Sequence, residues 1–112
     1  MKIDLLIPQP PKNETFKRSH ERFVPEVSGC YVLTTFSRDV LYIGLTENLR
    51  RRMNEHLDSP QKTGETKLGR ALLFFWMECT DTRLIERTWL NVHIQHEGAR
   101  PVLNKVDSPV AL

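Results

Sequence analysis

Residues 29–45 decide the fold of this chain, and their sequence is GCYVLTTFSRDVLYIGL. Residues 29–36 and 40–45 are rich in β-branched and aromatic side chains, which favour β-strands. The polar residues 37–39 between them are typical of a turn. The two runs are therefore predicted to pair as an antiparallel hairpin.

The hairpin carries two tyrosines, Tyr31 and Tyr42, whose relative orientation depends on the connecting loop. Side chains alternate between the two faces of a strand. The tyrosines share a face if the loop has an even number of residues or if the hairpin contains a β-bulge. A regular three-residue loop would place them on opposite faces. A site that uses both tyrosines therefore predicts an even loop or a bulge.

The next segment predicts a helix over about residues 47–57, with Thr46 as its N-cap. Apolar side chains recur at positions four apart and form one stripe, which consists of Leu49, Met53 and Leu57. Arg52 and His56 run along one edge of that stripe. Residues 58–68 contain proline, glycine and several polar side chains, and they predict a loop.

A buried strand is predicted next, at residues 71–79, because nearly all of these side chains are apolar. Asp81 or Thr82 can cap a second helix, over about residues 82–97, and Gly98 is expected to end it. Large aromatic side chains are the expected core of the domain, namely Phe74, Phe75, Trp76 and Trp89.

The element order β-β-α-β-α predicts a mixed α/β (α+β) fold with a small three-stranded antiparallel sheet flanked by helices. We expect an extended N-terminal arm at 1–28, where prolines disfavour regular structure. A single domain is expected at 29–105, followed by a C-terminal tail at 106–112.

Composition limits the class of protein. The chain has 112 residues, which suits one domain, and its 39% hydrophobic and 27% charged residues indicate a globular protein rather than a disordered one. A secretory leader and a membrane-spanning run are both lacking, so we expect a cytoplasmic protein. Cys30 and Cys79 lie in apolar runs and are expected to be buried free thiols. His93 and His96 are expected on a helix surface, and His20 in the arm.

The net charge of +2 does not by itself indicate nucleic acid. Residues 50–52 are three consecutive arginines, and residues 61–70 contribute three more basic side chains. Acidic residues flank the arginines, so charge alone favours a solvated, balanced surface, although such clusters also supply phosphate contacts. The candidate nucleic-acid contacts are Arg50, Arg51, Lys62, Lys67 and Arg70.

Two short motifs give the chain a resemblance to a known family. Gly29-Cys30-Tyr31 followed by Tyr42-Ile43-Gly44 resembles the paired motifs of the GIY-YIG nuclease superfamily, which includes homing endonucleases and the incision subunit of bacterial excision repair. Arg52 and His56 follow the second motif at the family's spacing. Glu86 lies near the start of the next long helix. The resemblance spans about residues 23–105 and ends with Asn104 in a Pro-x-Asn-like element.

The resemblance implies a metal-dependent endonuclease that hydrolyses a DNA phosphodiester and leaves a 3′-hydroxyl and a 5′-phosphate. Glu86 would hold Mg²⁺ or Mn²⁺, and Arg52 would bind the scissile phosphate. One of Tyr31 and Tyr42 would act as general base, and the sequence leaves that choice open. His56 and Asn104 would orient the site. Branched or damaged DNA is among the expected substrates.

Other interpretations stay open at this point. Without the resemblance, Glu86 is better explained as a surface residue beside Arg83 and Arg87, and the tyrosines as packed strand aromatics. The family motif also departs from the usual pattern, because Cys30 replaces isoleucine and Leu45 stands where the family often has a polar residue. A catalytically weak GIY-YIG module that binds nucleic acid or a protein partner is the alternative. A protein partner or a homodimer would then supply specificity.

Overall fold

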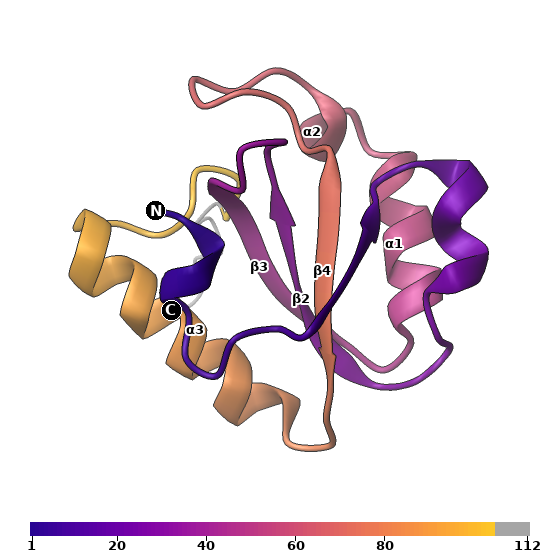
Figure 1. Ribbon diagram of the computed structural model, residues 1–112, viewed down its shortest axis with the longest axis horizontal. Helices are drawn as coiled ribbons and strands as arrows, with labels where there is room; N and C mark the ends of the chain where they lie inside the picture. Colours follow the sequence, from indigo (N-terminus) through magenta and orange to yellow (C-terminus); the bar gives the residue numbers. More distant parts are fainter. Residues whose placement is uncertain (105–112) are drawn as a thin grey trace, which may run out of the picture.

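Four antiparallel strands form one sheet, in the order β1-β4-β2-β3 (Figure 1). The computed structural model describes residues 1–104; residue 105 and the predicted tail at 106–112 lie outside the described residues. The strands are β1 (Lys12–Thr15), β2 (Gly29–Thr34), β3 (Val40–Thr46) and β4 (Leu73–Glu78). The α-helices are α1 (Leu49–Leu57), α2 (Pro60–Thr63) and α3 (Thr82–Glu97), and the 3-10 helices are η1 (Ile3–Leu5) and η2 (Arg18–Phe23).

The mixed α/β class is confirmed, but the expectation of three strands was wrong. The fourth strand, β1, comes from the segment that we expected to be an extended arm, and Lys12 pairs with Trp76 at its start. Its sequence, KNET, has no apolar alternation because it is an edge strand with exposed or half-buried side chains. Apolar residues of the same N-terminal segment are buried, namely Ile3, Leu6, Phe16 and Val24. Residues 1–28 are therefore part of the folded body.

The two long helices pack on opposite faces of the sheet, α1 to the right and α3 to the left in Figure 1. Strand β2 serves both cores, because its side chains alternate between the faces. The core on the α1 face includes Tyr31, Leu33, Leu49, Met53, Phe74 and Trp76. The core on the α3 face includes Cys30, Val32, Ile43, Phe75 and Trp89.

A β-bulge in the β2–β3 hairpin puts the two tyrosines on one face, as a shared site requires. Tyr42 lies opposite Leu33, whereas Val40 lies opposite Thr34, so one extra residue is inserted in β3. Tyr31 and Leu33 share a face of β2, and Tyr42 therefore joins them. Arg38 in the connecting turn has a φ of 72°, a conformation that helps the chain reverse direction.

Element boundaries differ slightly from the prediction at the first helix. α1 begins at Leu49, and its cap is Asn48, whose side chain accepts a hydrogen bond from the Arg51 amide at 3.0 Å. Thr46, the predicted cap, is still the last residue of β3. The predicted loop at 58–68 contains the short helix α2. Helix α3 follows the prediction, with Asp81 as its cap.

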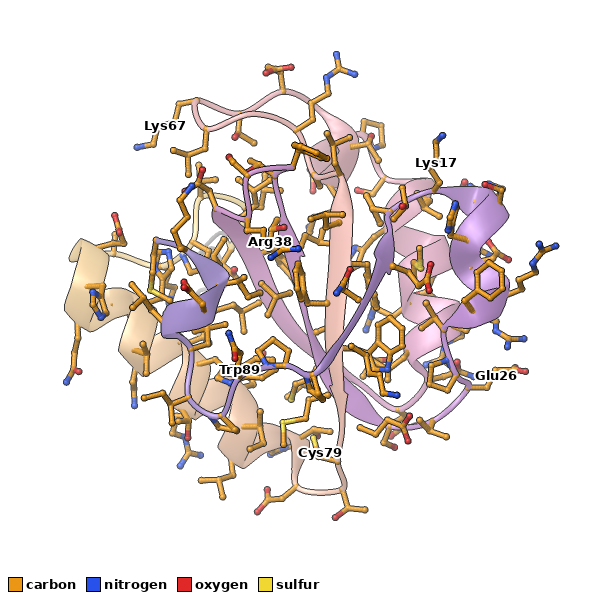
Figure 2. All side chains as sticks on the ribbon, viewed as in Figure 1. Lys17, Glu26, Arg38, Lys67, Cys79 and Trp89 are labelled. Carbon is orange, nitrogen blue, oxygen red and sulfur yellow. The ribbon has the colours of Figure 1, made fainter. Side chains whose placement is uncertain are left out.

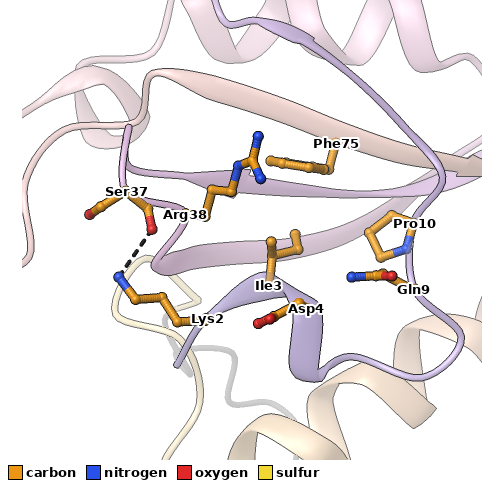
Figure 3. Close-up of a pocket in the computed structure, with 8 residues that line it drawn as sticks. All are labelled: Lys2, Ile3, Asp4, Gln9, Pro10, Ser37, Arg38 and Phe75. Carbon is orange, nitrogen blue, oxygen red and sulfur yellow. Dashed lines mark hydrogen bonds between the residues drawn. The ribbon is translucent and has the colours of Figure 1, made fainter.

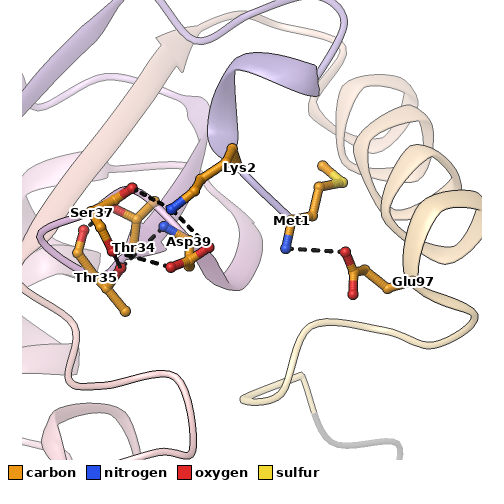
Figure 4. Close-up of polar contacts among 7 residues, drawn as sticks. All are labelled: Met1, Lys2, Thr34, Thr35, Ser37, Asp39 and Glu97. Atoms are coloured by element: carbon orange, nitrogen blue, oxygen red, sulfur yellow. Dashed lines mark hydrogen bonds and ion pairs between the residues drawn. The ribbon is translucent and has the colours of Figure 1, made fainter.

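Contacts with the β2–β3 turn and with helix α3 hold the N-terminal segment over the α3 face of the sheet. The Met1 amino group forms an ion pair with Glu97 at 3.2 Å, and Lys2 pairs with Asp39 at 3.3 Å (Figure 4). Trp89, labelled in Figure 2, donates from its indole nitrogen to the Pro8 carbonyl at 2.7 Å. These contacts bury the α3-face core under residues 1–8.

A cavity of about 260 Å³ lies between this segment and the β2–β3 turn (Figure 3). The Arg38 guanidinium is 5.9 Å from the centre of the Phe75 ring at its wall. Within residues 1–104, the structure contains no helix long and apolar enough to cross a membrane.

Candidate active site

The site is built around Tyr31, which is buried and makes a 2.6 Å hydrogen bond with Nε2 of His56. Its ring stacks on Phe74, with 5.2 Å between the centroids and an interplanar angle of 10°. The second glycine of the motif makes room for this hydroxyl. A Cβ at Gly44 would lie 2.5 Å from Tyr31 Oη, so only glycine fits under the tyrosine.

Tyr42 completes an aromatic cluster on the same face. Its ring centre lies 5.9 Å from that of Tyr31 and 5.3 Å from that of His56. Tyr42 is half-buried, so solvent reaches it. The Lys62 ammonium lies 4.8 Å from the centre of the Tyr42 ring, a distance at which cation–π attraction is favourable.

The Tyr31–His56 pair is electrically neutral at physiological pH. Burial, and then the positive charges of Lys62 and Arg52, lower the pKa of His56 to about 3. Burial also raises the pKa of Tyr31 well above its usual value, and the neighbouring Tyr42 adds to that effect. The phenol therefore keeps its proton, and a neutral imidazole nitrogen can accept it in a hydrogen bond.

Arg52 borders this cluster and has unused hydrogen-bonding capacity. Its Nη1 pairs with Glu55 at 3.0 Å. Its Nε is buried and has no hydrogen-bond partner among the described residues. The guanidinium also opposes the rise in the pKa of Tyr31, which puts its charge near the phenol. A buried donor without a partner is costly unless a ligand satisfies it.

Glu86 approaches from the other side of the sheet. It lies on α3 in an open groove of about 540 Å³, beside Leu45 of the edge strand β3. Among residues 1–104, the Glu86 carboxylate takes part in none of the hydrogen bonds or ion pairs. Burial raises its pKa, and the charges of Arg100 and Arg83 oppose that rise.

The edge strand β3 is what separates Glu86 from the aromatic cluster. The Glu86 charge contributes to the raised pKa of Tyr31, after the larger effects of burial and of Tyr42. This is the smallest of the effects on Tyr31, and among residues 1–104 no hydrogen bond or ion pair joins the Glu86 carboxylate to the aromatic cluster. Tyr31, Tyr42, His56 and Arg52 are brought together directly, and Glu86 is brought to the same strand from the opposite face.

Asn104 ties the C-terminal segment to that strand. Its side chain accepts from the Ile43 amide at 2.9 Å and donates to the Ile43 carbonyl at 2.8 Å. The Leu103 amide donates to the Leu41 carbonyl at 2.9 Å. These bonds hold the C-terminal segment along the edge of β3 from residue 41 to residue 43.

The donor set fits a hard divalent cation that keeps most of its water. Among the described residues, no group of three or more histidine, cysteine or acidic side chains is positioned to hold a metal. Glu86 supplies one carboxylate that no other described group occupies. A single carboxylate with water and substrate oxygens is a usual environment for Mg²⁺.

The predicted nucleic-acid contacts are mostly occupied by partners within the protein. Arg50 donates to the carbonyls of Val24 and Arg22 and pairs with Glu26, which joins α1 to the N-terminal segment. Arg51 and Arg70 form surface ion pairs, with Glu55 and Glu65 respectively. Lys67 lines a separate pocket beside the end of α3. Of the five, Lys62 is the one that adjoins the tyrosines.

Two smaller expectations need correction. His93 was expected on the surface but is 5% exposed, with Nδ1 2.7 Å from the Ala99 carbonyl. Its helix is covered by the N-terminal segment, which the sequence did not predict to fold there. Cys30 is a buried free thiol, as expected, whereas Cys79 is only half-buried.

The sequence placed Arg83 and Arg87 beside Glu86, but it predicted neither Arg100 there nor a groove that these side chains share. The groove is lined by Leu45, Arg83, Glu86, Arg87, Leu90, Asn91, Ile94 and Arg100. The available signal was the recurrence of these α3 residues at intervals of three and four, which places them on one helix face.

Comparison with known proteins agrees with this geometry. Two structures of the GIY-YIG N-terminal endonuclease domain of UvrC from Thermotoga maritima share the fold, each with a TM-score of 0.51. They are 17% and 16% identical to this chain, and each match covers 80% of this chain and 94% of the other. Both are tyrosine-to-phenylalanine point mutants bound to the catalytic divalent cation.

Sequence comparison gives the family itself. No curated protein matches the chain. The family model of the GIY-YIG catalytic domain matches residues 27–100, which is most of the chain and includes both motifs and Glu86. The chain therefore belongs to the GIY-YIG catalytic domain family.

Proposed function

We propose that this protein is a metal-dependent endonuclease that hydrolyses a phosphodiester bond in DNA. One observation carries the proposal: Tyr31 and Tyr42 form a cluster with His56 on one side of the edge strand β3, and Glu86 borders the same strand from the other side. Among residues 1–104, the Glu86 carboxylate takes part in no hydrogen bond or ion pair. The UvrC domains of the same fold are bound to a catalytic divalent cation, which supports a metal here as well.

Glu86 is the residue that would hold Mg²⁺ or Mn²⁺. When bound, such an ion stabilises negative charge on the phosphate and lowers the pKa of a bound water. Because burial raises the pKa of Glu86, the ionised carboxylate is poorly stabilised by the protein alone. A cation at this position offsets that cost.

Arg52 would bind the scissile phosphate. A guanidinium presents several donors in one plane, which suits a phosphate with its developing charge. The unsatisfied Nε points to this role, because a phosphate oxygen supplies the missing acceptor. The Arg52–Glu55 ion pair fixes the other end of the guanidinium.

We propose that Tyr42 is the general base that accepts a proton from the attacking water, and that Tyr31 is a positioning residue. Tyr31 is 1% exposed, and its raised pKa disfavours the phenolate. Tyr42 is half-buried beside the Lys62 ammonium, so it is both reachable and close to a positive charge. His56 holds the Tyr31 hydroxyl, and Asn104 holds the strand that carries Tyr42.

Nicking of supercoiled plasmid and cleavage of branched DNA test the proposal. The wild type is incubated with Mg²⁺, with Mn²⁺ and with EDTA, beside Glu86→Gln and Arg52→Gln. Glu78→Gln and Arg22→Gln are matched controls, since both residues are exposed and lie outside the site. We expect cleavage that requires metal, persists in the controls and disappears in the two site variants. DNA binding without cleavage by the wild type would indicate a binding module instead.

A further inference from the structure

We propose that the groove along α3 is a binding track for the DNA backbone, which continues from the scissile phosphate past Glu86. This inference rests on the proposed function, because it assumes a DNA substrate at the Tyr42–Arg52 side of β3. Arg83, Arg87 and Arg100 would contact successive phosphates. None of these three arginines was among the nucleic-acid contacts predicted from the sequence.

The groove carries an excess of positive charge among the described residues, although Arg83 and Arg100 interact electrostatically with Glu86. Its lining contains three arginines, and Glu86 is its single acidic residue. Among residues 1–104, neither a hydrogen bond nor an ion pair is made by the side chains of these arginines. The other basic candidates differ, because Arg51 and Arg70 are paired with glutamates.

The placement of these arginines costs stability in the free protein. Arg83 and Arg87 are four residues apart on α3, where like charges repel. Arg83 also lies in the first turn of the helix, which contains no acidic residue and where the helix dipole disfavours a cation. A polyanion in the groove would remove both costs.

The extent of the groove fits a strand rather than a single anion. Its α3 residues run from Arg83 to Ile94, roughly 16 Å along the helix axis at 1.5 Å per residue. Successive phosphates along one strand lie further apart than the rise of about 3.4 Å along the duplex axis, so this length takes a few nucleotides. Apolar side chains between the arginines, such as Leu90, give the sugars a surface to contact.

The groove also meets the active site at the right place. Leu103 and Asn104 hydrogen-bond to β3 at Leu41 and Ile43. Leu45, two residues on, lines the groove. A strand held by Arg52 would pass the edge of β3 and reach Glu86 before the arginines.

The test is the salt dependence of DNA binding, measured by fluorescence anisotropy with a labelled 30-base-pair duplex in EDTA. The double variant Arg83→Gln/Arg87→Gln is compared with Lys12→Gln/Lys17→Gln, which removes the same charge from two exposed side chains outside the groove. Log K falls as log salt concentration rises, and loss of two phosphate contacts makes this slope less steep by about 2. We expect that loss in the groove variant only. A wild-type slope in the groove variant, or an equal loss in the control, overturns the inference.

Further variants keep the result interpretable. Arg83→Lys/Arg87→Lys retains the charge and should retain most of the slope. If the double glutamine variant does not fold, Arg100→Gln, which lies outside the helix, should lower the slope by about 1. Binding is measured without metal, so it is independent of cleavage. If DNA binding depends on the groove arginines but the wild type cuts no DNA, the proposed endonuclease function fails and the groove inference stands. If the wild type cuts DNA but its binding does not depend on the groove arginines, this inference fails and the proposed function stands.

Discussion

At the scale of single residues, the account depends on His56, which is 7% exposed on α1 and faces Tyr31. The family resemblance implies an orienting role for this histidine. Its pKa of about 3, lowered mainly by burial, keeps it neutral across the physiological range. A neutral imidazole that is hydrogen-bonded to the Tyr31 hydroxyl fits such an orienting role.

The low pKa of His56 predicts a specific loss of stability in acid. The folded-state pKa is about 3 and the unfolded value about 6.5, so the unfolded chain binds one more proton between these limits. The stability present above pH 6.5 is therefore lost as the pH falls toward 3. Urea unfolding at pH 7 and pH 4.5 should show a larger loss for the wild type than for His56→Gln. Equal losses would mean that His56 is not buried in its neutral form.

Tyr31→Phe should lose more stability than Tyr42→Phe, whereas Tyr42→Phe should lose more cleavage activity. Tyr31→Phe keeps the stack on Phe74 but leaves the His56 nitrogen without its partner, at a cost of about 1–3 kcal/mol. Tyr42→Phe should cost less stability because Tyr42 is only half-buried. Its cleavage rate should fall further, by about 10²–10⁴-fold, as expected for loss of a general base. Single-turnover cleavage rates and urea unfolding of both variants measure these effects. A larger loss of cleavage rate in Tyr31→Phe would make Tyr31 the general base.

At the scale of elements, the β2–β3 hairpin was the best predicted part of the chain. The motif spacing led to a shared face for Tyr31 and Tyr42. That condition required an even loop or a bulge, and the structure contains a bulge. Strand β1 was not predicted, since KNET has a polar pattern and follows several prolines. An edge strand without a buried face has no alternation of apolar and polar side chains, so its sequence does not indicate a strand.

Gly44 of β3 gives the prediction at this scale. A methyl group there would lie 2.5 Å from Tyr31 Oη and 2.8 Å from a Tyr42 ring carbon. Gly44→Ala should therefore displace both tyrosines, lower stability by about 1–3 kcal/mol and abolish cleavage. Gly64→Ala, which meets only the Pro60 carbonyl at 3.1 Å, is the matched control. A fully active Gly44→Ala variant would show that the close packing of Tyr31 is unimportant.

At the scale of the whole molecule, residues far apart in the sequence are brought together, and this is where the sequence was least informative. Trp89 donates a hydrogen bond to Pro8, 81 residues earlier in the chain. The candidate site residues followed from the family spacing. Which arginines have partners among residues 1–104 did not follow, since Arg50 and Arg87 look alike until their neighbours are known.

The N-terminal segment should behave as part of the core rather than as a mobile arm. Leu6 is 1% exposed, whereas its neighbour Ile7 is 72% exposed. Leu6→Ala should lower the free energy of unfolding by about 2–5 kcal/mol, as for other buried leucines. Ile7→Ala should change it by less than about 0.5 kcal/mol. Urea unfolding measures both, and equal small effects would contradict the burial of this segment.

A double-mutant cycle on the single-turnover rate of metal-dependent DNA cleavage tests most directly whether Arg52 and Glu86 act in one site. Arg52 and Glu86 lie on opposite faces of the sheet, and the account places them in one site around β3. Arg52→Gln and Glu86→Gln should each remove most of the activity, and the double variant should lose little more, because groups that act as a unit are not additive. Losses that multiply independently, or a wild type that does not cut DNA with Mg²⁺ or Mn²⁺, would contradict the account.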